Sequence, residues 1–200
     1  KENLAAAMLI MSGYKGQGAL VDPMCGSGTI LVEAALMAQN RAPGLLGRRF
    51  AFINHPTYEM RIWNNMLGDA RSEIIEVEGC PIVGYDISYD AIRRAQTAVI
   101  GSGTDDIIRL KKLPVKDMPP IESGMLVTNP PYGERLGDIN QLTNVYRQLG
   151  DALKNCGSGV TGHVITSSKF LSQKTGLSFK AADPLWNGAL ECRLLHYEIY

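Results

Sequence analysis

The chain has 200 residues, of which 45% are hydrophobic and 20% are charged, and these values fit one globular domain with a full hydrophobic core. No apolar run is long enough to span a membrane and no signal-peptide pattern is present, so we expect a cytoplasmic protein without a membrane partner. The 20 Lys and Arg residues balance the 20 Asp and Glu residues; this neutrality disfavours a domain that binds RNA through its own charge, because phosphate contacts need basic residues.

Apolar residues recur along the chain at helical spacing and in the short runs typical of buried strands. The predicted elements, in chain order, are a helix at 2–11, a strand at 19–21, a helix at 29–39, a loop at 41–52, a helix at 58–70, a strand at 81–85 that ends at Asp86, a helix at 89–99, strands at 107–110 and 125–128, a helix at 141–153 and a strand at 162–167. This alternation predicts an α/β protein with a mainly parallel sheet. Residues 41–79 separate the first strand–helix unit from the second, so we interpret them as an insertion.

The C-terminal part has no helix between its two predicted strands. Residues 177–182 and 189–200 alternate between polar and apolar side chains, and residues 183–188, Asp-Pro-Leu-Trp-Asn-Gly, have the composition of a turn. Two strands joined in this way form an antiparallel hairpin, so we expect the sheet to end with one.

The segment Asp22-Pro23-Met24-Cys25-Gly26-Ser27-Gly28-Thr29 follows the first strand and opens the next helix. Backbone N–H groups are exposed at such a helix start, and glycines let a ligand approach the chain closely. Leu31 replaces the third glycine of the dinucleotide-binding fingerprint, so a pyrophosphate is not expected here. An acid before the turn instead suits a cofactor with an amino group and a carboxylate, although Asp22 could also cap the turn. We interpret Cys25 as a small turn residue, since no histidine stands in the motif to act as its base.

A second motif, Asn129-Pro130-Pro131-Tyr132, follows the strand at 125–128. Each proline fixes its own φ and donates no hydrogen bond, so the carbonyls here cannot enter a helix. The Asn129 amide and the Pro130 carbonyl therefore form a rigid pair of acceptors beside the Tyr132 ring, suited to a planar group that carries an NH2. Ligands of open parallel sheets bind at the carboxyl ends of the strands, which is where the motif lies.

Asp86 ends the second strand in Gly84-Tyr85-Asp86-Ile87-Ser88. A carboxylate at this position can accept both hydroxyls of a ribose. It could instead cap the following helix, a role that Ser88 could also fill. The three histidines and four cysteines have no metal-ligand spacing, so no metal is expected and a reducing cytosol fits.

Together the motifs resemble the class I S-adenosylmethionine-dependent methyltransferases that carry Asn-Pro-Pro-Tyr. The continuation Gly133-Glu134-Arg135-Leu136-Gly137 and the terminal Asn187-Gly188-Ala189-Leu190-Glu191-Cys192-Arg193-Leu194 are similar to the catalytic domain of the bacterial 23S ribosomal RNA guanine-N2 methyltransferases. The resemblance covers nearly the whole chain and implies a Rossmann-like sheet of seven strands in the order 3-2-1-4-5-7-6, with the last strand reversed. In that family a THUMP RNA-binding domain precedes the catalytic one. We therefore expect residues 1–200 to be a single catalytic domain, with RNA as its partner and a THUMP domain before it.

The resemblance also implies that S-adenosylmethionine is the cofactor. The cofactor-binding residues it implies are Asp22, Pro23, Cys25, Gly26, Gly28, Thr29, Asp86, Ile87, Asp117, Met118 and Asn129. Asp22 would lie near the amino group of the cofactor, directly or through water, and Asp117 would accept from the adenine 6-amino group with Met118 against the ring. Asn129, Pro130 and Tyr132 would be catalytic, with two acceptors for the target N–H groups and a ring that stacks on the extruded base.

Several alternatives stay open. Adenine-N6 DNA methyltransferases and protein-glutamine methyltransferases share the Asn-Pro-Pro-Tyr motif, and a guanine of transfer RNA is a further possible target. A non-catalytic RNA-assembly module is disfavoured by the intact Asp86 and Asn129, and an NAD-linked oxidoreductase by Leu31 and the terminal hairpin. Glu134 and Arg135 could pair with each other to hold their loop, or Arg135 could meet a phosphate. The sequence gives no indication of an oligomeric state.

Overall fold

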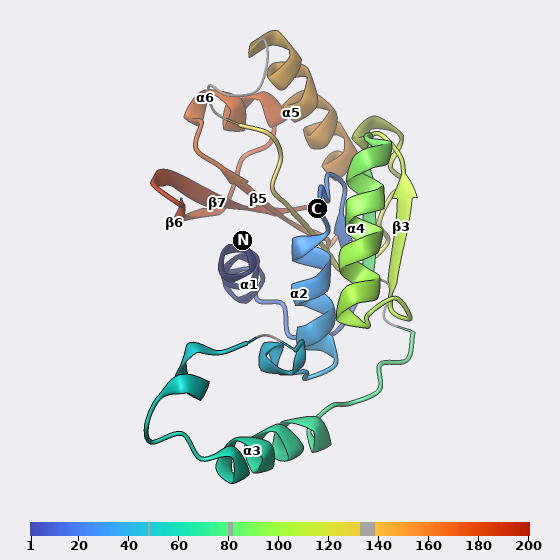
Figure 1. The fold of residues 1–200 in the computed structure, drawn as a ribbon. Helices are drawn as coiled ribbons and strands as arrows, with labels where there is room; N and C mark the ends of the chain where they lie inside the picture. The colour runs from blue at the N-terminus through green and yellow to red at the C-terminus, as the bar shows by residue number, and fades with distance from the viewer. Residues whose placement is uncertain (48, 80–81, 133–138) are drawn as a thin grey trace.

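The computed structural model describes residues 1–200 except 48, 80–81 and 133–138. One seven-stranded sheet lies between two layers of helices (Figure 1). The strands are β1 (Leu20–Asp22), β2 (Ile82–Asp86), β3 (Ile108–Lys112), β4 (Met125–Thr128), β5 (Thr161–Thr166), β6 (Ala181–Asn187) and β7 (Leu190–Glu198). Their order is β3-β2-β1-β4-β5-β7-β6, with β7 antiparallel to β5 and β6 and all other pairs parallel. The strand order and the reversed C-terminal strand implied by the family resemblance are confirmed.

The helices divide between the two faces of the sheet. They are α1 (Glu2–Met11), α2 (Thr29–Ala38), α3 (Met60–Ser72), α4 (Tyr89–Ser102), α5 (Ile139–Lys154) and α6 (Lys169–Ser172). Helices α1, α2 and α4 lie on one face, and α5 and the short α6 lie on the other (Figure 1). Between β3 and β4 the chain forms a 3-10 turn, Val115–Asp117, and no α-helix, as the sequence pattern predicted.

Two hydrophobic clusters, one on each face, hold the sheet in place. Leu20 and Leu31 belong to the cluster under α1, α2 and α4, whereas Leu126 and Leu153 belong to the cluster under α5, and all four are fully buried. Strand β1 is buried throughout its length because it lies in the middle of the sheet with helices on both sides. This explains why the central strands read as continuous apolar runs in the sequence.

The C-terminal hairpin differs from its predicted boundaries. Strand β6 runs through the expected turn at 183–188, and the chain reverses only at Gly188, whose φ of 71° needs a glycine. Pro184 is tolerated inside β6 because this strand forms the edge of the sheet, where a missing N–H need not break a ladder. Trp186 also lies in β6 and is 60% exposed, so it does not pack into the core.

Residues 41–79 form an arm that extends away from the sheet (Figure 1). Its helix α3 has no buried residue. The arm is attached at its base to the end of α2, where Asn40 Nδ2 donates to the Glu73 carbonyl at 3.1 Å and the Ile75 N–H donates to the Gln39 carbonyl at 3.0 Å. Within the arm, aromatic rings pack on one another with centroids 5.0–6.2 Å apart; they belong to Phe50, Phe52, Tyr58 and Trp63.

Candidate active site

Three of the predicted site segments meet at the carboxyl edge of the sheet. Asp22 is the last residue of β1, Asp86 is the last residue of β2, and Asn129 directly follows β4. Because β1 pairs with both β2 and β4 in parallel, these three strand ends are neighbours in space. The sheet therefore brings together residues that are more than 100 positions apart in the sequence, Asp22 and Thr128 among them.

Asp22 is a buried acid at the centre of this edge. Its side chain is 1% exposed, and its Oδ1 accepts hydrogen bonds from the Thr128 hydroxyl at 2.7 Å and from the Met24 N–H at 3.1 Å. Burial raises the pKa of Asp22 from 3.8 to about 7; the two hydrogen bonds oppose this shift and the nearby charge of Asp86 adds to it. Both hydrogen bonds end on Oδ1, which leaves Oδ2 for a ligand.

Asp86 fixes the glycine turn to the end of β2. Its Oδ2 accepts from the Gly26 N–H at 3.0 Å and its Oδ1 from the Ser88 N–H at 2.8 Å. The Ser88 hydroxyl accepts from the Ala91 N–H at 3.3 Å, so Ser88 caps α4 and Asp86 is not needed for that role. A carboxylate has about four lone-pair sites, so Asp86 keeps acceptor capacity for a ligand.

The glycine turn itself has the conformation that its sequence suggested. Gly26 and Gly28 have φ values of 55° and 78°, which side chains with a Cβ rarely adopt, and α2 begins at Thr29. A Cβ on Gly28 would lie 3.1 Å from the Ala95 Cβ, so this glycine also allows α2 and α4 to pack closely. A Cβ on Gly26 would meet no atom within 4 Å, so its backbone faces open space that a ligand can fill.

Cys25 is 6% exposed, and burial together with the charges of Asp22 and Asp86 raises its pKa well above the usual value for a thiol. A nucleophilic cysteine needs the opposite, a lowered pKa that yields thiolate at neutral pH. The environment of Cys25 therefore fits a structural residue of the turn.

A cavity of about 230 Å³ lies between these elements, and part of the predicted site lines it. Its lining includes the predicted residues Asp22, Cys25, Gly26, Thr29 and Asn129. Residues that the sequence did not suggest line it as well, among them Met8 of α1, Lys1 directly before α1, and Asn187 at the end of β6. The apolar face of the N-terminal helix and the terminal Asn-Gly motif were the available signals for these residues.

Other predicted cofactor residues have different surroundings. Asp117 is exposed in the turn after β3, and Ile87 is 69% exposed beyond the end of β2. Met118 is 8% exposed and packs in the hydrophobic cluster under α5. None of the three lines the 230 Å³ cavity. Pro23 and Gly28 are buried within the turn beside it, and Pro130 is buried behind Asn129.

Tyr132 joins the Asn-Pro-Pro-Tyr motif to the C-terminal hairpin. Asn187 Nδ2 donates to the Tyr132 hydroxyl at 3.1 Å, and Cys192 Sγ lies 3.6 Å from the same oxygen. Burial raises the pKa of Tyr132 to about 12, and its ring packs against the small cluster that contains Tyr146 and Leu171. The Asn-Pro-Pro-Tyr motif and the terminal segment 187–194 are thus in direct contact. The continuation from Gly133 to Gly137, with Glu134 and Arg135, lies outside the described residues.

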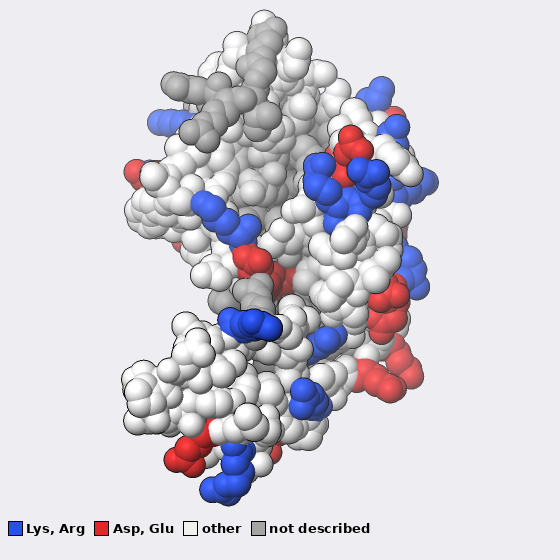
Figure 2. Space-filling model, in the orientation of Figure 1, with Lys and Arg blue, Asp and Glu red and all other residues white. Residues whose placement is uncertain are grey.

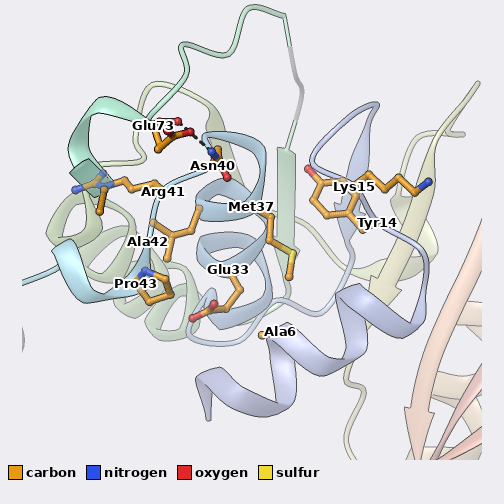
Figure 3. A pocket seen from close by; sticks show the side chains of 12 residues that line it. Ala6, Tyr14, Lys15, Glu33, Met37, Asn40, Arg41, Ala42, Pro43 and Glu73 are labelled. Carbon is orange, nitrogen blue, oxygen red and sulfur yellow. Dashed lines mark hydrogen bonds between the residues drawn. The ribbon is translucent and has the colours of Figure 1, made fainter. Parts of the chain in front are cut away.

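A larger cavity of about 630 Å³ lies elsewhere, between α1, the second half of α2 and the base of the arm (Figure 3). Glu33, Arg41 and Pro43 contribute to its walls, and none of the predicted site residues does.

The charged side chains on the face drawn in Figure 2 are scattered, and they do not merge into one basic surface. In the part of the chain that the structure describes, no three His, Cys, Asp or Glu side chains form a group that could hold a metal ion. No described helix is long and apolar enough to cross a membrane.

These features define a Rossmann-like methyltransferase domain. They are the seven-stranded sheet in this order, the glycine turn after β1, the acid at the end of β2 and Asn-Pro-Pro-Tyr after β4. A comparison with protein families identifies one family. The model described as "RMKL-like, methyltransferase domain" matches residues 1–196, and the chain belongs to this family.

Individual relatives agree with this assignment. The chain is 38% identical over 211 residues to the ribosomal RNA large subunit methyltransferase K/L of Syntrophotalea carbinolica, and it covers 30% of that protein. It is 30% identical to SMU.472, a putative methyltransferase whose crystal structure contains SAH, with a TM-score of 0.90. It is also 30% identical to a predicted N6-adenine-specific DNA methylase from Listeria monocytogenes, again with a TM-score of 0.90. All of this chain is covered in each case, but only 53% and 51% of the two solved chains, so it spans between about a third and a half of these proteins.

Proposed function

We propose that this domain transfers a methyl group from S-adenosylmethionine to the exocyclic N2 of a guanine in the RNA of the large ribosomal subunit. The observation that carries the proposal is the single cavity where Asp22, Gly26 and Asn129 meet, in a member of the RMKL-like family. The name of the Syntrophotalea relative supports ribosomal RNA as the substrate, and the SAH in the SMU.472 crystals supports the cofactor.

Residues that line the cavity, together with Asp86 and Asp117 outside its lining, fit the parts of the cofactor. The second carboxylate oxygen of Asp22 would accept from its ammonium group, and the open backbone at Gly26 would lie along its methionine part. Asp86, held by two backbone N–H groups, would accept from the ribose hydroxyls. Asp117 is exposed after β3, where it would accept from the adenine amino group. When bound, the cofactor supplies an electrophilic methyl group on its sulfonium.

Asn129 and Pro130 would orient the target amine. The lone pair of an exocyclic guanine nitrogen is delocalised into the ring, so this nitrogen is a weak nucleophile until it pyramidalises. Asn129 Oδ1 and the Pro130 carbonyl would accept its two N–H groups and direct the lone pair at the methyl. This contribution is positioning and electrostatic, because the prolines hold both acceptors rigidly before the substrate arrives.

Tyr132 would hold the base after it leaves its helix. The bond from Asn187 and the packing against Tyr146 fix the ring, so it can stack on the base without losing further freedom. Unstacking a base costs a few kcal/mol, and stacking on an aromatic ring returns about 1–3 kcal/mol. A fixed ring at this position therefore offsets much of the cost of extrusion.

Nucleoside mass spectrometry of ribosomal RNA from cells with and without the gene tests the base and the atom together. We expect N2-methylguanosine to be lost from one position of the large-subunit RNA, and to return with the wild-type gene but not with Asn129→Ala. In single-turnover assays on RNA from the deletion strain, Asn129→Ala should slow methyl transfer by roughly a hundredfold or more while calorimetry shows an unchanged cofactor affinity. A fully active Asn129→Ala protein with a lower melting temperature would overturn the catalytic role.

Adenine N6 is the second candidate for the acceptor atom, because the Listeria relative is described as a predicted N6-adenine-specific DNA methylase and the Asn-Pro-Pro-Tyr site suits either amine. The same mass spectrometry separates the two, since the adenine reading requires loss of N6-methyladenine from DNA with unchanged ribosomal RNA.

We also propose that a second domain, of the THUMP type and N-terminal to this one, supplies most of the affinity for RNA. The chain spans only part of the proteins it matches, and its net charge is zero. Adding the N-terminal part of the protein should therefore tighten RNA binding strongly while leaving cofactor affinity unchanged, as filter-binding and calorimetry can measure.

A further inference from the structure

We infer that a second cavity, at the carboxyl end of β5, binds the nucleotide next to the target base in the RNA strand. The inference rests on the proposed function. The cavity has a volume of about 270 Å³ and lies between α6, the end of β5 and the start of β7. Its walls include Thr166, Lys169, Phe179, Glu191 and Arg193. We call it the hairpin cavity.

The hairpin cavity adjoins the proposed catalytic loop. Thr166 and Arg193 are directly opposite each other in the β5–β7 register. Cys192, the residue before Arg193, also lines the cavity, and its Sγ lies 3.6 Å from the Tyr132 hydroxyl. On the other wall, the Tyr146 hydroxyl donates to Thr166 Oγ1 at 2.9 Å, and Tyr146 belongs to the cluster that Tyr132 packs against. An RNA strand whose target base is held at Asn129 would then reach this cavity with the neighbouring nucleotide.

The charges of the cavity suit a phosphate. Lys169 and Arg193 are both exposed, and neither forms an ion pair within the described residues. Among the described residues, the cations that do form ion pairs are Arg93, Lys154 and Lys180. The walls of the cavity therefore contain two cations without an ion pair among the described residues, Lys169 and Arg193, and one acid, Glu191. This excess of positive charge favours a phosphate group, and Glu191 remains as an acceptor for the N–H groups of a base.

Phe179 gives the cavity a surface for a base. Its ring is 45% exposed and is held edge-on against Tyr197, with centroids 6.4 Å apart and planes at 89°. Nucleic acid strands are commonly held by aromatic rings beside cations, because every base can stack and every nucleotide carries a phosphate. Phe179, Lys169 and Arg193 offer both contacts within one cavity of the size of a nucleotide base and its phosphate.

The test uses the full-length protein and large-subunit ribosomal RNA from a strain without the gene. The double variant Lys169→Gln/Arg193→Gln should raise the RNA Kd by about tenfold and reduce the salt dependence of binding by about one to two phosphate contacts. Phe179→Ala should weaken RNA binding by roughly tenfold, and Phe179→Tyr should restore it because it keeps a stacking ring. Cofactor Kd, measured by calorimetry, should stay unchanged in all of them and reports that the fold is intact.

A matched control separates a specific site from a general loss of charge. Arg109→Gln/Lys154→Gln removes the same two charges from β3, at the opposite edge of the sheet, and from the end of α5. If the hairpin variants bind RNA with the same Kd and salt dependence as this control, the inference is wrong. If the wild-type protein neither binds nor methylates RNA, the proposed function itself fails, and the two failures are thereby distinguished.

Discussion

The buried carboxyl of Asp22 should make the stability of the free domain depend on pH. It holds its proton up to a pH of about 7, whereas in the unfolded chain it ionises near 3.8. Between these values the folded chain binds more protons than the unfolded chain, so the free energy of unfolding falls as the pH rises. The contribution is fully present below 3.8 and is lost as the pH rises through 7. Linkage gives a loss of roughly 2–3 kcal/mol between about pH 5 and about pH 8.

Asp22→Asn isolates this effect, because the amide keeps an oxygen for the hydrogen bonds from Thr128 and Met24 but cannot ionise. Between about pH 5 and about pH 8, the stability of the variant relative to the wild type should rise by roughly 2–3 kcal/mol. That corresponds to a relative increase of about 5–10 °C in Tm for a domain of this size. Thermal and denaturant unfolding of both proteins without cofactor measure it. A stability difference that is equal at the two pH values would refute the assignment of a buried, protonated Asp22.

Cofactor binding should remove the proton from the Asp22 carboxyl. An ammonium group beside the carboxyl favours its charged form, so binding near neutral pH should release a proton and become tighter as the pH rises toward about 7. Titration calorimetry in two buffers of different ionisation enthalpy detects that proton. Asp22→Asn should abolish the release and weaken binding by roughly ten- to a hundredfold. Normal binding by the wild type without proton release would place the ammonium group elsewhere.

Four further substitutions test other parts of the structure. Asp86→Asn should weaken cofactor binding by roughly ten- to a hundredfold in calorimetry, because a charged acceptor of the ribose hydroxyls is lost; unchanged affinity in a folded protein would remove Asp86 from the site. Tyr132→Phe keeps the ring but loses the bond to the hairpin, so it should cost about 1 kcal/mol of stability with little change in the single-turnover rate; a large rate loss at an unchanged Tm would instead give the hydroxyl a role in the chemistry. Gly150→Ala directs a Cβ at the Thr175 carbonyl and should cost about 1–3 kcal/mol, whereas Gly68→Ala meets open space in α3 and should stabilise by about 0.5–1 kcal/mol. Thermal unfolding compares the two glycine variants, and similar shifts would contradict the packing of α5.

The sequence predicted which strand ends would lie side by side because of a general property of parallel sheets. Asp22, Asp86 and Asn129 each follow an apolar run, and the carboxyl ends of neighbouring parallel strands share one edge, so their meeting could be expected before any coordinates. Helix 2–11 and strand 125–128 were predicted with the observed bounds, since their apolar pattern is unambiguous. The turn at 183–188 was wrong because Asp183-Pro184 and Asn187-Gly188 are both turn signals, and the edge position of β6 decides between them.

The properties of individual groups depended on the tertiary structure. The raised pKa of Asp22 results from burial and from its bond to Thr128, 106 positions away. The contact between Asn187 and Tyr132 joins residues 55 positions apart, and the lining from α1 comes from the other end of the chain. A local pattern predicts how a segment folds and which end of a strand a residue occupies. It does not determine which distant segment covers that residue, and in this protein the covering segments set its charge, its hydrogen bonds and its access to a ligand.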